Sequence, residues 1–338
     1  MKAFVTGATG FLGAHIARAL RERGDAVRCL ARPTSRRQAL ADLDVEWQVG
    51  ALDDADGLRR AIDGCDLVFH CAADYRFSPA RPAEVYRSNV DGTRAVLAAC
   101  AAAGVGRVVY TSSVATIGQP PGGGPADETT ATSLRDMIGP YKRSKYLAEQ
   151  VALTWAERGL PIVIVNPSTP IGERDARPTP TGQMLVDFLA RRVPAYVDTG
   201  LNLVDVRDVA AGHLLAAERG VIGQRYILGH RNLTLREIFD RLGEIAKVRW
   251  RRIRLPHVVP LVIAALEAPL ARLRGRPPRV SLEAVRLARK PMFFDAGKAV
   301  RVLGLPQSPI EPALERAVSW FRANGYVPAL PWPAAPVA

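Results

Sequence analysis

The stretch Thr6-Gly7-Ala8-Thr9-Gly10-Phe11-Leu12-Gly13 follows a short apolar run and carries glycines in the spacing G-x-x-G-x-x-G. The first glycine permits a tight turn, the second lets the backbone approach a ligand, and the third lets a helix pack closely on a strand. This pattern predicts a strand, a turn and a helix whose first N–H groups bind phosphate. The alternative is a turn that packs a helix on a strand and binds no ligand.

The residues after this turn alternate short apolar runs with helical patterns. The predicted strands cover residues 2–6, 26–31, 45–49, 67–71, 107–111 and 161–165, and the predicted helices cover 12–23, 55–63, 83–103 and 141–158. Strands that alternate with helices indicate βαβ units and a parallel sheet. The strands are apolar almost throughout, as expected when helices cover both faces. The predicted fold is therefore α/β, a Rossmann-type doubly wound parallel sheet with a smaller, mainly helical C-terminal domain.

This pattern divides the chain of 338 residues into two domains. Residues 1–167 and 201–229 are predicted to form a dinucleotide-binding Rossmann domain. Residues 168–200, rich in Pro, Thr and Gly, and residues 230–326 are predicted to form a substrate-binding domain. Residues 327–338 form a proline-rich tail that we expect to be loose.

Cysteine and histidine usage excludes several kinds of site. The four cysteines form no C-x-x-C pair, so we expect buried free thiols in a reducing compartment, the cytoplasm. The five histidines form no metal-binding spacing, so no metal site is expected. No stretch of about 18 or more uncharged apolar residues is present, so we expect no spanning helix.

The net charge of +13 is concentrated near the C-terminus. Residues 247–290 hold twelve basic and two acidic residues, a net charge of +10, around the apolar run 255–273. One interpretation is a core helix with a solvated basic rim. Another is peripheral contact with anionic lipid at the inner face of the membrane. Nucleic-acid binding is disfavoured because no aromatic platform or nucleic-acid motif accompanies the charge.

The end of the second predicted strand indicates which nicotinamide cofactor binds. It ends Cys29-Leu30-Ala31-Arg32, with no carboxylate to hydrogen-bond a ribose 2′-hydroxyl. A guanidinium at Arg32 would instead pair with a 2′-phosphate. We therefore expect NADP(H) as the preferred cofactor and NAD(H) as the alternative. Ala72 and Ala73 follow the fourth strand, where small side chains let the backbone approach a cofactor.

Tyr141 and Lys145 are one helical turn apart, downstream of Ser113 at the end of the fifth strand. An ammonium beside a phenol lowers the phenol's pKa from its usual value near 10, so Tyr141 could exchange a proton with a substrate oxygen. We expect Ser113 to hold that oxygen and Asn89 to orient Lys145 through its backbone or a water. Each residue alone would more often be a surface tyrosine, a helix cap or a turn residue, but together they predict nicotinamide redox chemistry.

These motifs resemble the extended short-chain dehydrogenase/reductase family, which includes sugar-nucleotide epimerases, dehydratases and dihydroflavonol reductases. The resemblance runs from Met1 to about residue 325 and rests on the glycine turn, the strand at 109–113 and Tyr141-x-x-x-Lys145. Within that family, the segments 71–76, 166–172, 196–204 and 289–294 resemble the hopanoid-associated sugar epimerase group. The resemblance also implies a homodimer through helices near 83–103 and 141–158.

The resemblance implies roles residue by residue. Tyr141 matches the proton donor and acceptor, Lys145 its partner, and Ser113 the substrate-holding serine. The expected cofactor-binding residues are Gly7, Thr9, Gly10, Phe11, Leu12, Gly13, Arg32, Leu52, Ala72, Ala73, Tyr141, Lys145, Pro167 and Ser168. The chain departs from the family at Gly50-Ala51-Leu52, where an aspartate usually stands in place of Ala51, so side-chain recognition of the adenine at that position is lost.

The expected activity is hydride transfer at a hydroxyl or carbonyl carbon of a sugar-like small molecule, with a role in hopanoid lipid biosynthesis implied by the resemblance. An epimerase would return the hydride to its substrate, whereas a reductase of the dihydroflavonol reductase type would exchange NADPH at each turnover. A third hypothesis, from another class, is a non-catalytic regulator that senses NADP(H). The intact Tyr141 and Lys145 argue against such a sensor.

Overall fold

The structure is a computed structural model that describes residues 1–75, 81–248, 252–273, 285–286 and 288–327. The chain forms two compact units. Unit 1 comprises Met1–Pro170, Val204–His230 and Phe294–Ser308, and unit 2 comprises Ile171–Leu203, Arg231–Phe293 and Pro309–Ala338. This division differs from the predicted one at Phe294–Ser308, which joins unit 1 because α11 (Gly297–Leu303) packs on α7 and β10. Most of the predicted tail, residues 328–338, lies outside the described residues.

Unit 1 is built on a seven-stranded sheet with the order β10-β6-β5-β4-β1-β2-β3. All its strand pairs are parallel. The strands are β1 (Lys2–Thr6), β2 (Ala26–Ala31), β3 (Glu46–Val49), β4 (Leu67–His70), β5 (Arg107–Thr111), β6 (Ile162–Pro167) and β10 (Arg225–Leu228). The strand order reverses between β1 and β4, and ligands of open α/β sheets bind at the carboxyl ends of the strands at such a point.

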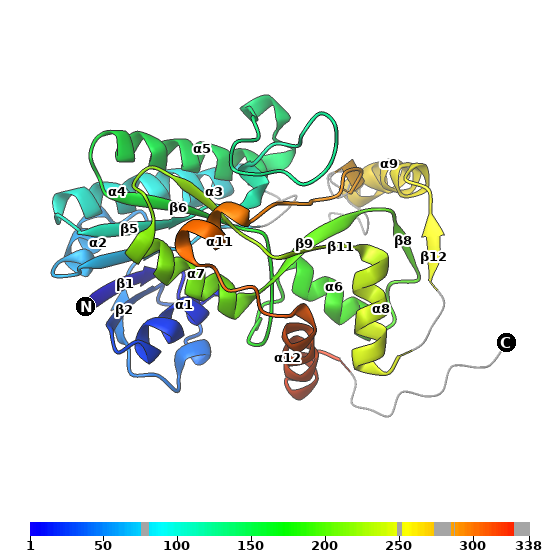
Figure 1. Ribbon diagram of the computed structural model, residues 1–338, viewed down its shortest axis with the longest axis horizontal. Coiled ribbons are helices and arrows are strands. Elements are labelled where there is room, and N and C mark those ends of the chain that lie inside the picture. Colours follow the sequence, from blue (N-terminus) through cyan, green and yellow to red (C-terminus); the bar gives the residue numbers. More distant parts are fainter. Residues whose placement is uncertain (76–80, 249–251, 274–284, 287, 328–338) are drawn as a thin grey trace. The chain divides into compact units, whose positions relative to one another are not determined.

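Helices cover both faces of this sheet, as Figure 1 shows. Helices α2 (Ala55–Ile62), α4 (Gly92–Ala102) and α5 (Gly139–Glu157) cover one face, and α1 (Phe11–Glu22) and α7 (Val206–Arg219) cover the other. Apolar side chains of α2, α4 and α5 form one buried cluster with β1, β4, β5 and β6, including Leu58, Leu97 and Ala152. The predicted doubly wound parallel sheet is therefore confirmed.

The predicted helix at 83–103 contains an irregular turn. The structure divides it into α3 (Pro82–Tyr86), a π-helical turn η2 (Arg87–Asp91) and α4. A π-helical turn inserts one residue into the helical ladder and is frequent at functional sites. Here it carries Asn89, which is buried.

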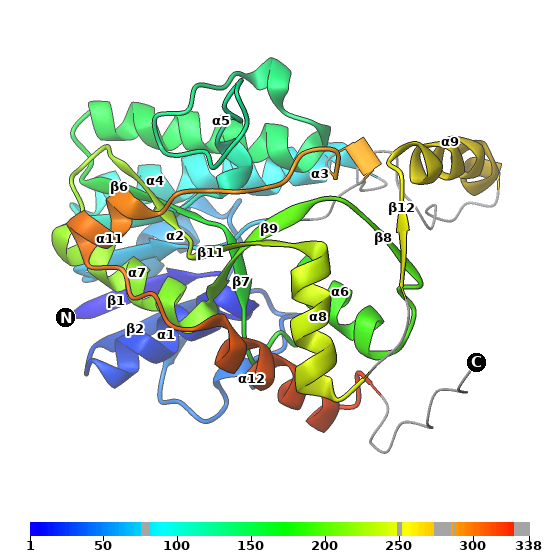
Figure 2. The same ribbon diagram turned by 45° about the vertical axis from the view of Figure 1, so that its right-hand side comes forward.

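Unit 2 is mainly helical, as predicted. Its helices are α6 (Pro180–Leu189), α8 (Leu235–Ala246), α9 (Val258–Leu273) and α12 (Ile310–Ala323). Figure 2 shows α6, α8 and α12 packed together, around a core that includes the stacked rings of Phe188 and Phe239. The chain enters this unit through β7 (Thr169–Ile171) and leaves it through β9 (Gly200–Asp205), and β11 (Arg231–Thr234) pairs with β9. A second small sheet pairs β8 (Ala195–Val197) with β12 (Ile253–Leu255).

All four cysteines are free; Cys29, Cys65 and Cys100 are buried, and Cys71 is half-buried. Within the described ranges, no group of three or more His, Cys, Asp or Glu side chains could hold a metal ion.

Candidate active site

The glycine turn connects β1 to α1 in the way that its sequence predicts. Gly7 has a φ of +75°, and a Cβ at that position would lie 2.8 Å from the backbone nitrogen of Ala72. A Cβ at Gly13 would lie 2.2 Å from the carbonyl oxygen of Gly7. Since neither neighbour is a flexible side chain, any larger residue would displace the backbone. The turn is closed by a 2.9 Å hydrogen bond from Gly10 N to Gly7 O.

The start of α1 suits an anionic ligand. Gly10 is the N-cap residue, no side chain caps the helix, and its first turn holds no acidic residue. Thr9, Phe11 and Leu12 surround this helix end and are partly accessible. The first N–H groups of a helix and its dipole together attract phosphate. This cradle therefore fits the pyrophosphate of a dinucleotide.

The other predicted cofactor residues lie at the carboxyl ends of the strands or just beyond them. Arg32 is exposed at the end of β2, the strand that pairs with β1. Ala72 follows β4, and its N–H donates to Thr6 Oγ1 at 3.2 Å. Ala73 is half-buried next to it. Leu52 follows β3 and packs against Gly92 at the start of α4, where a Cβ would lie 2.9 Å from Leu52 Cδ1.

Pro167 and Ser168 occupy the corresponding end of β6. Pro167 is the last residue of β6 and is buried. Ser168 N donates to Leu228 O at 3.0 Å. Its hydroxyl oxygen is buried and has no hydrogen-bond partner among the described residues. A buried hydroxyl without a partner at this edge of the sheet is consistent with a polar ligand group there.

Tyr141 and Ser113 are brought together by α5 and the end of β5. Ser113 Oγ accepts a hydrogen bond from Ala115 N at 3.1 Å, which leaves its own proton available to donate. Burial raises the pKa of the Tyr141 phenol, and its hydrogen bond with Ser113 lowers that pKa in part. A phenol with a raised pKa stays protonated at neutral pH, so Tyr141 holds the proton that a substrate oxygen would receive.

Lys145 projects from α5 toward β5. Its ammonium donates to Thr111 O at 2.7 Å and to Tyr110 Oη at 3.2 Å. Burial lowers the pKa of Lys145 to about 8, while Glu149 and Cys71 raise it in part. The sequence predicts that Lys145 lowers the pKa of Tyr141, and here that prediction is wrong. The ammonium is directed at two acceptors from β5, and burial dominates the pKa of the phenol.

Asn89 contacts a neighbour of Lys145, not Lys145 itself. Its side-chain oxygen accepts from Asp74 N at 2.7 Å, and its amide donates to Asp74 O and to Ser144 Oγ, both at 2.9 Å. Asn89 therefore ties the segment after β4 to α5, beside Lys145. These contacts do not test the prediction that Asn89 orients Lys145 through a water.

A buried polar network beneath Lys145 escaped the sequence analysis. His70 Nδ1 lies 2.7 Å from Thr6 Oγ1, and His70 Nε2 lies 3.0 Å from Thr93 Oγ1. Thr93 donates to Asn89 O at 2.6 Å, so its oxygen must accept from His70. Thr93 also hydrogen-bonds Tyr110, the acceptor of Lys145. Burial lowers the pKa of His70 to about 3, so the imidazole is neutral and its proton is on Nε2. The sequence signal that could have revealed this network is His70 itself, a histidine inside an otherwise apolar strand.

Glu149 is a second residue that the sequence analysis missed. It lies one turn after Lys145 on α5, is fully buried, and accepts from Thr116 Oγ1 and Asn166 Nδ2, both at 2.8 Å. Arg225 pairs with its other oxygen at 3.2 Å. The spacing i, i+4, i+8 of Tyr141, Lys145 and Glu149 could have revealed it, because those positions share a helix face.

Glu149→Gln is expected to shift the pH profile of turnover. The carboxylate raises the pKa of Lys145, so its removal lowers that pKa and lets Lys145 lose its proton at lower pH. We expect the basic limb, near pH 8 in the wild type, to move down by on the order of one pH unit. Turnover measured against pH tests this, with the exposed Glu157→Gln on the same helix as the control. An unshifted limb would show that Glu149 has only a packing role.

Comparison with known protein families gives one matching family model. Residues 3–229 match the model described as the NAD dependent epimerase/dehydratase family. The matched range ends close to the end of β10.

Several curated proteins are similar over almost the whole chain. A protein of Synechocystis assigned as a dihydroflavonol 4-reductase is 50% identical and covers 96% of this chain and 95% of its own length. Sterol demethylase protein B of Methylococcus capsulatus is 35% identical, with coverages of 97% and 100%. A 4-hydroxy-2-methyl-3-oxo-4-farnesyl-3,4-dihydroquinoline-1-oxide ketoreductase of Stigmatella aurantiaca is 33% identical, with coverages of 90% and 91%.

Solved structures share the fold over the same length. A nucleoside-diphosphate-sugar epimerase from Pseudomonas aeruginosa is 31% identical, with a TM-score of 0.80 and coverages of 97% of this chain and 99% of that chain. The dTDP-glucose 4,6-dehydratase of Streptomyces venezuelae, solved with NAD bound, is 26% identical, with a TM-score of 0.75 and the same coverages.

Proposed function

The chain belongs to the NAD-dependent epimerase/dehydratase family, within the extended short-chain dehydrogenase/reductases, and we propose that it is an NADPH-dependent reductase of a ketone on a large apolar substrate. The observation that carries this proposal is the half-buried Tyr141, whose phenol is hydrogen-bonded to Ser113 and which is followed one turn later by the buried Lys145. A protonated phenol beside a serine hydroxyl is suited to donate a proton to the oxygen of a carbonyl that is being reduced.

Each residue of the site would have a distinct role in the reduction. NADPH, when bound, supplies the hydride that goes to the carbonyl carbon of the substrate. Ser113 would hold the carbonyl oxygen, and Tyr141 would give its proton to that oxygen, so that a secondary alcohol forms. Lys145, anchored by Thr111 O and Tyr110 Oη, would hold a positive charge one helical turn from Tyr141 on the same face of α5. The helix start at Gly10 would hold the pyrophosphate.

The exposed Arg32 supports a preference for NADPH over NADH. Arg32→Ala is expected to weaken the preference for NADPH, expressed as the ratio of kcat/KM values, by about ten- to a hundredfold, since a charge-assisted contact to phosphate contributes about 1.5–3 kcal/mol. Steady-state kinetics with both cofactors measures this ratio. Arg36→Ala removes another exposed arginine of the same loop and serves as the control. An unchanged ratio in Arg32→Ala would mean that the 2′-phosphate is recognised elsewhere.

The substrate class rests on the names of the relatives. A sterol demethylase protein and a ketoreductase of a farnesyl-bearing quinoline are 35% and 33% identical to this chain. Both names denote bulky, apolar ring systems, and one of them states ketone reduction. Metabolite profiling of a deletion strain, with lipids included, followed by assay of the accumulated ketone with NADPH, tests this proposal. Accumulation of a nucleotide sugar, with no apolar ketone, would contradict it.

A second candidate is an epimerase that acts on a sugar-like group during hopanoid lipid biosynthesis. The similarity to a nucleoside-diphosphate-sugar epimerase favours it. An epimerase retains its cofactor because the hydride returns to the substrate, whereas a reductase releases it. The cofactor that co-purifies with the chain separates the two. Tightly held NAD+ at one per chain supports the epimerase, and an empty chain that binds NADPH supports the reductase.

The proposed setting is the cytoplasm, with the chain as a homodimer. The dimer would form through α4 and α5, as the family resemblance implies. Peripheral membrane contact through residues 247–290 is also proposed.

A further inference from the structure

Exposed large apolar side chains gather on one short part of unit 2. Ile253, Val258, Val262, Ile263 and Leu266 each expose between 40% and 66% of their surface. They make up five of the thirteen exposed large hydrophobic residues in the described chain. Isolated exposed apolar residues are ordinary, but a contiguous set marks an interaction surface.

The geometry of α9 places its exposed apolar residues on one side of the helix. Successive residues of an α-helix are about 100° apart, so Val258, Val262 and Leu266 lie along one side of α9. The exposed positions of α9 among residues 258–267 are Val258, Val262, Ile263, Ala265 and Leu266, all of which are apolar. The small Ala264 is buried on the opposite side, and the charged Glu267 is half-buried. A surface helix normally shows the reverse pattern, with its charged face toward water.

Basic residues surround this apolar face in the sequence. Residues 247–290 carry a net charge of +10. Among the described basic residues of that segment, the exposed ones are Lys247, Arg254, Arg286, Arg289 and Lys290. Arg254 pairs with Asp198, which neutralises part of the charge. An anionic bilayer has an apolar acyl region beneath anionic headgroups. An apolar helix face with a surplus of basic residues complements both parts of such a surface.

The length of α9 excludes a spanning role. It has 16 residues and contains Pro260 and Pro269, whereas a spanning helix needs about 20 apolar residues. Within the described residues, no helix is long and apolar enough to cross a membrane. A helix of this kind lies along the interface with its apolar side in the acyl boundary.

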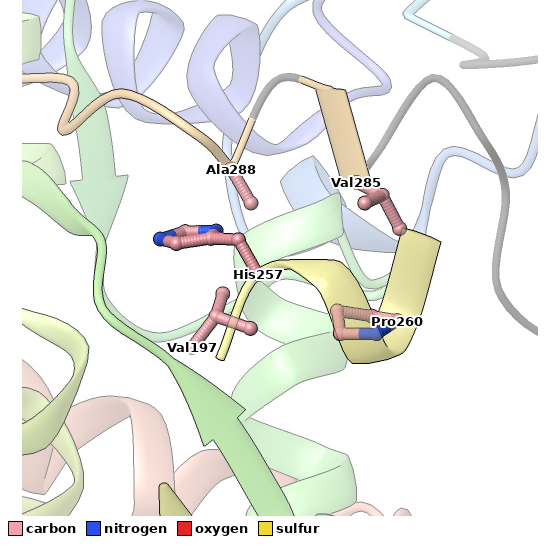
Figure 3. Close-up of a pocket in the computed structure, with 5 residues that line it drawn as sticks. All are labelled: Val197, His257, Pro260, Val285 and Ala288. Carbon is pink, nitrogen blue, oxygen red and sulfur yellow. The ribbon is translucent and has the colours of Figure 1, made fainter. Parts of the chain in front are cut away.

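An apolar cavity lies beside the N-terminal end of α9, as Figure 3 shows. Its volume is about 180 Å³, and its lining residues are Val197, His257, Pro260, Val285 and Ala288. His257 Nε2 donates to Asp198 O at 2.9 Å, and His257 Nδ1 is buried without a partner among the described residues. A space of about 150 Å³ is enough for a benzene-sized group. The volume and apolar lining of this pocket therefore suit an apolar group of similar size.

We propose that unit 2 docks onto an anionic lipid bilayer through the lipid-docking face, which comprises Ile253 and the Val258, Val262, Ile263 and Leu266 side of α9. The cavity behind it would receive the apolar end of a lipid drawn from that bilayer. Docking does not depend on the reaction proposed above, because the face and its charge lie outside the catalytic residues.

Vesicle binding tests the lipid-docking face. The full chain is sedimented with vesicles of phosphatidylcholine alone and with vesicles that also contain phosphatidylglycerol. We expect binding to the anionic vesicles only, weakened by added salt because exposed charges are screened. Val262→Glu combined with Leu266→Glu is expected to lower the partition coefficient at least about tenfold.

The matched control is Val221→Glu combined with Ile222→Glu, two apolar residues of unit 1 that are about half exposed. This pair is expected to bind vesicles like the wild type. Circular dichroism and NADPH oxidation with a water-soluble ketone, measured without vesicles, show whether each variant is folded and active. A folded wild type that does not oxidise NADPH would contradict the proposed reaction. It would not change the conclusion drawn from vesicle binding.

Two results would overturn lipid docking. One is equal binding of the wild type and the α9 double variant to anionic vesicles. The other is a wild type that ignores vesicles while the α9 double variant changes from dimer to monomer in light scattering. In that case the face is covered by a second copy of the chain.

Discussion

Tyr141→Phe is expected to lower turnover of the ketone substrate by about 10²–10⁴-fold, with the chain still folded. The change deletes one hydroxyl, and general acid catalysis contributes about 10²–10⁴-fold to a rate. The affinity for NADPH should change little, because the glycine turn and Arg32 are untouched. Steady-state turnover, with cofactor binding measured by fluorescence, tests both statements. Tyr146→Phe, five residues further along α5, is the matched control and should retain full activity.

Tyr141→Phe also distinguishes a catalytic function of the chain from a non-catalytic, NADP(H)-sensing function. If Tyr141→Phe binds NADPH, loses turnover and fails to complement a deletion strain, the chain acts through catalysis. Full complementation by a variant without turnover would instead require the non-catalytic NADP(H)-sensing function.

Lys145→Met is expected to have the second largest effect, a loss of turnover of two orders of magnitude or more. The ammonium is held by Thr111 O and Tyr110 Oη, and no other cation is positioned by those two acceptors among the described residues. Methionine keeps the apolar stem, so the loss measures the charge and its hydrogen bonds. The wild type should lose activity above about pH 8, as Lys145 loses its proton, whereas the residual activity of Lys145→Met should lack that limb.

The pH dependence of stability provides an independent test of the buried ammonium. Burial lowers the pKa of Lys145 from 10.5 to about 8 in the folded chain, so between these values the unfolded chain binds more protons. The wild type should therefore gain stability relative to Lys145→Met as the pH rises from about 8 to 10.5, by up to about 1.4 kcal/mol per pH unit. Chemical denaturation at several pH values measures the difference. A difference that stays constant would place the pKa of Lys145 near its ordinary value.

Local patterns in the chain were sufficient for the fold of unit 1. The glycines at Gly7, Gly10 and Gly13 permit one strand–turn–helix geometry, and apolar runs of strand length between helical patterns leave few other arrangements. Such signals are local because sterics and burial act on consecutive residues. The order of Ser113, Tyr141 and Lys145 along the chain also predicted the candidate site. Ser113 follows a strand, and the carboxyl ends of parallel strands lie at one edge of the sheet.

Contacts between distant segments decided the electrostatics of the site. The pKa of Tyr141 depends on how deeply the phenol is buried, and the direction of the Lys145 ammonium depends on acceptors from β5. His70 and Glu149 gain their roles from partners 64 and 33 residues away in the sequence. The exposed apolar side of α9 is likewise a property of the folded unit, because an apolar run in a sequence is normally buried. Residue type sets what a side chain can do, and packing sets its solvation and its partners.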